Sequence, residues 1–145
     1  MNGKSSRLIS ILLWLLAAFY LANGIEMFFL PATWFYRLVP GVPETGPFNA
    51  HLVADSGTFS LGLAVGLVFA AFEPRRHAVA VVIAAVASVM HAILHIYSHE
   101  AGLLSYQHIT TEVVGIYVPT IILCVLAFML MRPVREAPRA ATHTA

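Results

Sequence analysis

The residues best suited to chemistry are histidines and carboxylates placed four residues apart within apolar stretches. The pairs are His51/Asp55, His91/His95 and His108/Glu112, and His99 follows His95 at the same spacing. Residues four apart share one face of an α-helix. Because an ionisable side chain is costly in lipid, we expect each such face to turn inward, where its groups pair with one another, with water or with a cation.

Imidazole and carboxylate donors together favour a divalent transition metal. They suit Fe, Zn, Mn or Cu(II). The single cysteine, Cys124, excludes a thiolate cluster and an intrachain disulfide. We predict four metal ligands, His51, Asp55, His91 and His95.

Four further ionisable residues are predicted to assist this site. Glu26 and Glu112 would move protons, and His99 and His108 would support the ligands or hold a second ion. His99 and His108 flank a short turn, so the alternative is that both are simply solvated at the rim. Haem is a less favoured cofactor, because two axial histidines on facing helices would leave the carboxylates unexplained.

The stretches that carry these residues are long enough to cross a membrane. Hydrophobic residues make up 59% and charged residues 10% of the 145 residues, with a mean hydropathy of +0.82. Soluble domains average about 25% charged residues. Crossing a bilayer takes about 20 apolar residues in a helix, and backbone groups in lipid must pair within their own segment. The apolar stretches therefore predict an all-α, four-helix transmembrane bundle.

We place the helices at about residues 8–30, 47–72, 78–101 and 106–131 of a single domain, 1–131, followed by a disordered cytoplasmic tail, 132–145. The first stretch could be a signal peptide, but its apolar run is too long for a typical one, so we expect it to be retained. Pro47, with Thr45 or Gly46 as cap, should begin the second helix. Gly102 should end the third helix and Ser105 should cap the fourth.

Depth along the helices aligns the ionisable groups. A rise of about 1.5 Å per residue places His51 level with His95, and Asp55 level with His91, on antiparallel helices. All four helices then carry ionisable side chains in the outer half of the bundle. We predict that His51 and Asp55 face His95 and His91 as two halves of a metal clamp.

Basic residues predict the orientation. Seven Lys and Arg residues flank one side of the helices and only Arg37 the other. Under the positive-inside rule both termini are cytoplasmic. The site would then face the periplasm across a bacterial inner membrane. A net charge of +1 argues against nucleic acid as a partner.

The stretch TGPFNAH at residues 45–51, with Asp55 four residues later, resembles a group of small bacterial four-helix membrane proteins. Members of this group share a proline-rich outer loop and a similar start of the second helix. The resemblance implies the four-helix membrane fold and marks this helix start as a family feature. It implies no activity, because the group is largely uncharacterised.

These features favour a metal-dependent membrane oxidoreductase acting on a lipophilic substrate. The alternatives are a non-enzymatic metal-handling subunit of a larger membrane complex, a metal-free proton-shuttle enzyme of the isomerase type, and a small b-type cytochrome. The pair Gly62 and Gly66 is typical of close helix contact, within the bundle or in a homodimer.

Overall fold

The computed structural model describes residues 3–132, and this part of the chain is helical without strands. The long helices are α1 (Gly3–Phe29), α3 (Ala50–Phe72) and α4 (Ala78–Glu100). A fourth run, Tyr106–Met131, comprises η3 (Tyr106–His108), α5 (Ile109–Glu112), η4 (Val113–Tyr117) and α6 (Val118–Met131). All 4 are long and apolar enough to cross a membrane, which confirms the predicted all-α bundle. The tail predicted at 132–145 lies outside the described residues, apart from Arg132.

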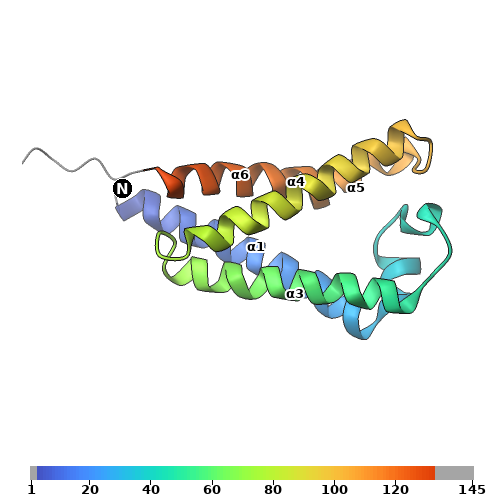
Figure 1. Ribbon diagram of the computed structural model, residues 1–145, viewed down its shortest axis with the longest axis horizontal. Helices are drawn as coiled ribbons and strands as arrows, with labels where there is room; N and C mark the ends of the chain where they lie inside the picture. The colour runs from blue at the N-terminus through green and yellow to red at the C-terminus, as the bar shows by residue number, and fades with distance from the viewer. Residues whose placement is uncertain (1–2, 133–145) are drawn as a thin grey trace, which may run out of the picture.

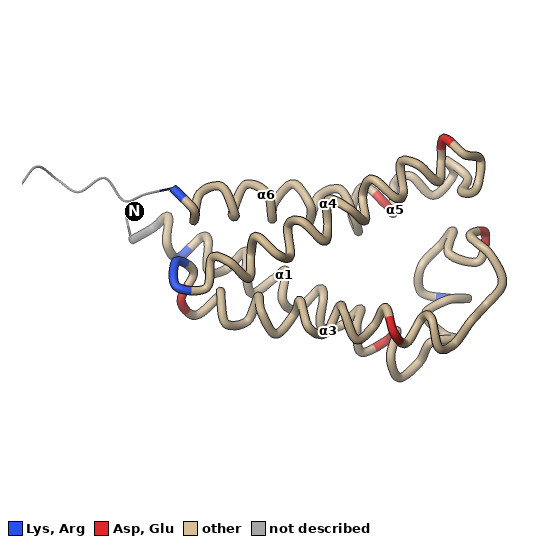
Figure 2. The backbone as a smooth tube through the Cα atoms, in the orientation of Figure 1, with Lys and Arg blue, Asp and Glu red and all other residues tan. Residues whose placement is uncertain are grey.

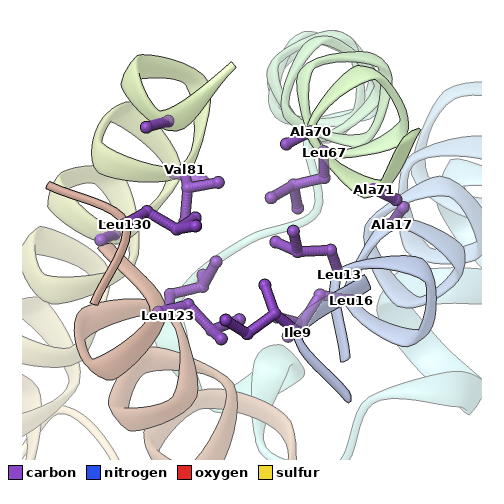
Figure 3. Packing of buried hydrophobic residues seen from close by; sticks show 14 residues of the cluster. Ile9, Leu13, Leu16, Ala17, Leu67, Ala70, Ala71, Val81, Leu123 and Leu130 are labelled. Carbon is purple, nitrogen blue, oxygen red and sulfur yellow. The ribbon is translucent and has the colours of Figure 1, made fainter. Parts of the chain in front are cut away.

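The helices form two antiparallel pairs, α1 with α3 and α4 with α6. The pairs meet near the 73–77 turn and diverge toward the opposite end (Figure 1). We call these the turn end and the loop end; the loop end carries residues 30–49 and 101–105. The core lies toward the turn end and includes Leu13, Leu67, Val81 and Leu123, each 0% exposed (Figure 3). Since lipid is as apolar as leucine, close packing rather than burial from water holds these helices together.

Two glycines set the distance between α1 and α3. A Cβ added at Gly57 would lie 2.9 Å from Met27 Cβ, and one at Gly24 would lie 2.9 Å from Leu61 Cγ. Gly62 has nothing within 4 Å of its added Cβ. The close approach of α1 and α3 therefore uses Gly24 and Gly57. Gly66 has an ordinary contact with Ala80 of α4, 3.4 Å from its added Cβ, and a role of the Gly62/Gly66 pair in a homodimer stays a prediction.

We expect Gly57→Ala to destabilise the protein by about 1–3 kcal/mol, the usual cost of overpacking. The added methyl group would also lie 2.9 Å from the backbone nitrogen of Phe28, so α1 and α3 would have to separate. Thermal and denaturant unfolding of detergent-purified protein, followed by circular dichroism, measures the change. Gly62→Ala is the matched control, since its methyl group meets open space. Equal stability of the two variants would refute this packing account.

A layer of hydroxyl groups joins the two helix pairs. Ser88 Oγ donates to Ala84 O at 2.8 Å, so Tyr20 Oη, 2.6 Å away, donates its own proton to Ser88 Oγ. Ser60 Oγ donates to Tyr20 O at 2.8 Å, and Thr120 Oγ1 lies 3.3 Å from Ser88 O. The Ser60 and Ser88 protons are committed to backbone carbonyl groups, so we read the layer as a structural bridge rather than a proton path.

The start of α3 corrects the sequence prediction. The helix begins at Ala50, three residues after Pro47, because the Asn49 side chain accepts the Leu52 N–H at 3.1 Å. Asn49 itself is extended, with φ −132° and ψ 105°. Asparagine is among the best N-cap residues and satisfies one N–H that the first turn leaves unpaired. Local side-chain capping therefore overrides the preference of proline for the first helical position.

The end of α4 follows the prediction. Gly102 has φ +70°, its N–H donates to His99 O at 3.0 Å, and the N–H of Leu103 donates to Ser98 O at 2.8 Å. This is the Schellman arrangement, which favours glycine at the left-handed position. The Ser105 side chain caps the next turn, as predicted. Together they fold residues 101–105 back over the end of α4.

An irregular turn lies just before Pro119, which is the second residue of α6. Residues Val113–Tyr117 are π-helical, and the N–H of Val118 bonds to Val113 O. Proline has no N–H for the carbonyl four residues earlier, here that of Gly115. A single wider turn of this kind is rare and is often found beside functional sites.

Candidate functional site

Charge is divided between the two ends of the bundle. Lys and Arg gather at the turn end, whereas most Asp and Glu lie toward the loop end (Figure 2). Glu73 is the acidic exception at the turn end, where it pairs with Arg76 at 3.1 Å. The ionisable residues singled out from the sequence therefore belong to the loop-end half of the molecule.

Glu112 is the centre of the candidate site. Its side chain extends from α5 toward α4 and the residue is 6% exposed. One oxygen, Oε2, lies 2.8 Å from His99 Nε2 and 3.2 Å from His95 Nδ1. A single carboxylate oxygen thus joins two histidines of the neighbouring helix.

The contacts of His99 fix where its protons are. His99 Nδ1 lies 3.0 Å from the carbonyl oxygen of Leu104, which can only accept, so Nδ1 carries a hydrogen. His99 Nε2 and Glu112 Oε2 must then hold one proton between them to form their 2.8 Å hydrogen bond. The pair is either imidazolium with carboxylate or neutral imidazole with carboxylic acid. In both forms the His99–Glu112 pair holds a transferable proton in a buried position.

His95 links Glu112 to a ring nitrogen that is in contact with solvent. Its Nδ1 donates to Glu112 Oε2, which leaves Nε2 with a free lone pair in the neutral ring. Within residues 3–132, Nε2 has no hydrogen-bond partner, and it is not sealed from solvent contact. The ring of His91 stacks on that of His95, with centroids 4.8 Å apart and planes 20° apart. The structure therefore brings together four predicted residues, His91, His95, His99 and Glu112.

The alternative in which His99 is solvated at the rim is wrong. His99 is 6% exposed, and the ring of Tyr106 stacks on it at 4.4 Å. Counting depth from the helix end missed this burial because the turn after Gly102 folds Leu104 and Tyr106 over the histidine. The shared helical face of His91, His95 and His99 was the available signal.

The two predicted metal ligands on α3, His51 and Asp55, do not lie beside the histidines of α4. His51 Nε2 is 3.3 Å from Asp55 Oδ2, and both side chains are exposed on α3. Within the described residues no hydrogen bond or ion pair joins them to the histidines of α4. The divergence of the helix pairs toward the loop end accounts for this (Figure 1). A role for His51 and Asp55 as metal ligands stays a prediction.

The side chains of Glu26 and His108, the two remaining predicted residues, form no hydrogen bond or ion pair with the Glu112 cluster within residues 3–132. Glu26 is half-buried on α1, and its carboxylate has no hydrogen bond or ion pair in the part of the chain that the structure describes. His108 Nε2 lies 2.9 Å from Glu44 Oε1. His108 thus belongs to a contact with the loop of residues 30–49 rather than to the Glu112 cluster.

The loop of residues 30–49 reaches across the loop end to the other helix pair. It contains the short helices α2 (Pro31–Thr33), η1 (Trp34–Leu38) and η2 (Val42–Thr45). Glu44 accepts the Ser105 N–H at 3.1 Å and a Gln107 side-chain N–H at 2.9 Å, in addition to its contact with His108. Gly41, with φ +88°, packs so closely that an added Cβ would lie 3.0 Å from His108 Cδ2. Sequence reasoning missed Glu44, although it is the only acidic residue of the loop.

The Glu44 contact should open in acid. The Ser105 N–H, followed by His108, lowers the pKa of the Glu44 carboxyl from its usual value. A lowered pKa means that the contact stabilises the closed loop above the ordinary pKa and is lost as pH falls through the lowered one. Amide hydrogen exchange in residues 39–46 should therefore rise as pH falls below roughly 4.

Glu44→Gln is the matched variant for this test. It should exchange faster than the wild type at neutral pH and show little further change in acid, after correction for intrinsic exchange rates. A wild-type loop whose corrected exchange is independent of pH would contradict the account.

Two cavities border the buried histidine. The larger, of about 670 Å³, lies under the Glu44 contact and is lined by Glu44, His99, Gly102, Leu103, Leu104, Ser105, Tyr106 and Gln107. The smaller, of about 280 Å³, is lined by Ile96, His99, Glu100, Tyr106, Ile109 and Tyr117. His99 and Tyr106 form part of both walls. Both cavities therefore reach the cluster at His99.

The described residues hold no group of three or more His, Cys, Asp or Glu side chains arranged for a metal ion. Ligands about 2.0–2.1 Å from a tetrahedral zinc stand about 3.3 Å from one another. The 2.8 Å contact of Glu112 Oε2 with His99 Nε2 is shorter than that separation and is a hydrogen-bond distance, whereas the 3.2 Å contact with His95 Nδ1 is close to it.

Comparison with protein-family models, curated proteins and solved structures found no match for this chain, so the resemblance drawn from residues 45–55 stays a prediction.

Proposed function

We propose that this multi-pass membrane protein is an enzyme that transfers protons to and from a lipophilic substrate by general acid–base catalysis. One observation carries the proposal: Glu112 Oε2 lies 2.8 Å from His99 Nε2 and 3.2 Å from His95 Nδ1, while His99 Nδ1 lies 3.0 Å from Leu104 O. From these contacts we infer that His99 and Glu112 share a proton. A positioned acid or base of this kind contributes roughly 10²–10⁴-fold to a reaction rate. This is the metal-free, isomerase-type enzyme that the sequence left open as an alternative to the oxidoreductase.

Each residue of the cluster has a distinct role in this proposal. His95 Nε2 exchanges a proton with the substrate, and Glu112 relays that proton to or from His99. The carbonyl oxygen of Leu104 holds His99 in the tautomer that keeps Nε2 toward Glu112. The 670 Å³ cavity beside His99 lets the buried pair regain equilibrium with water.

The charge distribution supports an orientation for the site. Basic residues gather at the turn end (Figure 2), and the positive-inside rule makes that end cytoplasmic. The loop end and the Glu112 cluster then face the outside, the periplasm in a bacterial inner membrane.

A divalent metal ion such as Fe, Zn or Cu(II) is the second candidate, which would make the protein an oxidoreductase or a metal-handling subunit. One observation favours it. Histidines that bind metals usually donate their other ring N–H to a carbonyl or carboxylate group, as His99 Nδ1 does here. Modest separation of Glu112 from His95 and His99 would make room for the ion. Elemental analysis of protein purified without chelators, beside Glu112→Gln, tests this candidate.

Deuterium transfer tests the acid–base proposal. Membranes containing the protein are incubated in D₂O, and their lipid-soluble compounds are searched by mass spectrometry for deuterium bound to carbon. We expect a compound labelled by the wild type, with labelling at least about 100-fold slower in Glu112→Gln. Glu73→Gln, at the turn end, is the control and should label normally. Absence of any protein-dependent labelling would contradict proton transfer at carbon.

A further inference from the structure

The smaller cavity is a groove between α4 and the start of the fourth helical run. Its 280 Å³ are bounded by six residues, Ile96, His99, Glu100, Tyr106, Ile109 and Tyr117. Ile96 and Tyr106 are exposed on helices long and apolar enough to cross a membrane. The groove therefore opens sideways toward the bilayer.

Polarity changes along the groove. Glu100 is the last residue of α4 and Tyr106 the first of the fourth run, so both lie at the level of the membrane surface. Tyr106 Oη donates to Glu100 Oε1 at 3.0 Å. Ile96, Ile109 and Tyr117 continue the groove toward the bilayer interior. A polar mouth above an apolar floor matches a molecule with a charged head and a hydrocarbon chain.

The charge at the mouth is negative and uncompensated by lysine or arginine. Residues 78–131 contain neither amino acid. Among the residues that the structure describes, Glu100 forms no ion pair. A carboxylate beside tyrosine rings is the chemistry that recognises ammonium groups, through direct charge attraction and cation–π contact.

We propose that this groove binds a bilayer lipid with an ammonium-bearing zwitterionic head. The ammonium group lies at Glu100 and Tyr106, and the first part of an acyl chain lies along Ile96, Ile109 and Tyr117. Apolar cavities of about 150 Å³ accommodate benzene. A groove of 280 Å³ therefore has room for an ammonium head and a few methylene groups. Because His99 forms its inner wall, such a lipid would also shield the buried pair from the bilayer side.

Short-chain lipids test the proposal on the full chain in an uncharged maltoside detergent. Dihexanoyl phosphatidylcholine and dihexanoyl phosphatidylglycerol are titrated against the thermal unfolding midpoint, which rises with the occupancy of a native-state ligand. We expect phosphatidylcholine to raise the midpoint saturably and phosphatidylglycerol to act only at about tenfold higher concentration. In Glu100→Gln the apparent affinity for phosphatidylcholine should fall about tenfold. Glu73→Gln at the turn end is the control and should bind as the wild type does.

A second variant keeps the test valid if Glu100→Gln fails to fold. Tyr106→Leu removes the ring placed against the ammonium group, so phosphatidylcholine affinity should fall by several-fold. Equal affinity for the two lipids, or unchanged affinity in both variants, would overturn the proposal. Choline chloride binding as tightly as phosphatidylcholine would also overturn it, because the groove would then hold a soluble ammonium compound rather than a lipid.

Discussion

Replacing Glu112 by alanine is expected to destabilise the protein by about 3–5 kcal/mol, the usual cost of removing one partner from a buried ionic pair. The substitution leaves His99 Nε2 and His95 Nδ1 without the acceptor that they share. It also removes the side-chain connection that holds α4 against α5. Denaturant unfolding in detergent micelles, followed by circular dichroism, measures the loss.

Two further variants show whether the loss of stability is specific to the hydrogen bonds of Glu112. Glu26→Ala removes a half-buried carboxylate that lacks a partner in residues 3–132, and we expect a change of at most about 0.5 kcal/mol. Glu112→Gln retains hydrogen bonding without the shared proton, so it should fall between the other two variants. If Glu112→Ala were no less stable than Glu26→Ala, Glu112 would not be the structural centre of the cluster.

Replacing His95 by glutamine is expected to slow deuterium transfer by about 10²–10⁴-fold while changing the unfolding free energy by less than about 1 kcal/mol. The glutamine amide can still donate to Glu112, but it cannot accept and release a proton near neutral pH. His95 is also less buried than Glu112, so the fold depends on it less. The rate is measured with the labelled compound identified for the wild type.

The neighbouring histidine supplies the control for this variant. His91→Gln removes the ring stacked on His95 but no atom that binds Glu112. We expect its rate to fall by less than about tenfold, because His95 keeps its hydrogen bond. Equal losses in the two variants would show that the histidine stack, rather than His95 Nε2 alone, exchanges the proton.

The features predicted well from the sequence are those that depend on neighbouring residues. Hydropathy averaged over one stretch predicts a membrane span, and Gly102 and Ser105 act within their own turns. His91 and His95 lie on one face because the helical repeat places them there. None of these predictions requires knowledge of which helices pack together.

The features that the sequence did not predict depend on packing between helices. Gly24 and Gly57 bring α1 and α3 together, and the two pairs then diverge, which leaves His51 and Asp55 away from the α4 histidines. Matching residues by their depth along straight helices packed side by side assumes that all four helices stay in contact over their full length. The divergence of the two pairs breaks that assumption. Capping by Asn49 was readable from the sequence, but the neighbouring proline was given more weight.

Nitrogen-15 NMR of histidine-labelled protein tests most directly whether His99 and Glu112 share a proton. At roughly pH 6–8, in the ordinary titration range of histidine, we predict one histidine with a protonated Nδ1 and a strongly hydrogen-bonded Nε2. That signal should disappear in His99→Gln and lose its strong hydrogen bond in Glu112→Gln, while His51→Gln leaves it unchanged. A His99 signal that titrates like a free imidazole and is identical in Glu112→Gln would contradict the shared proton, and with it the acid–base function.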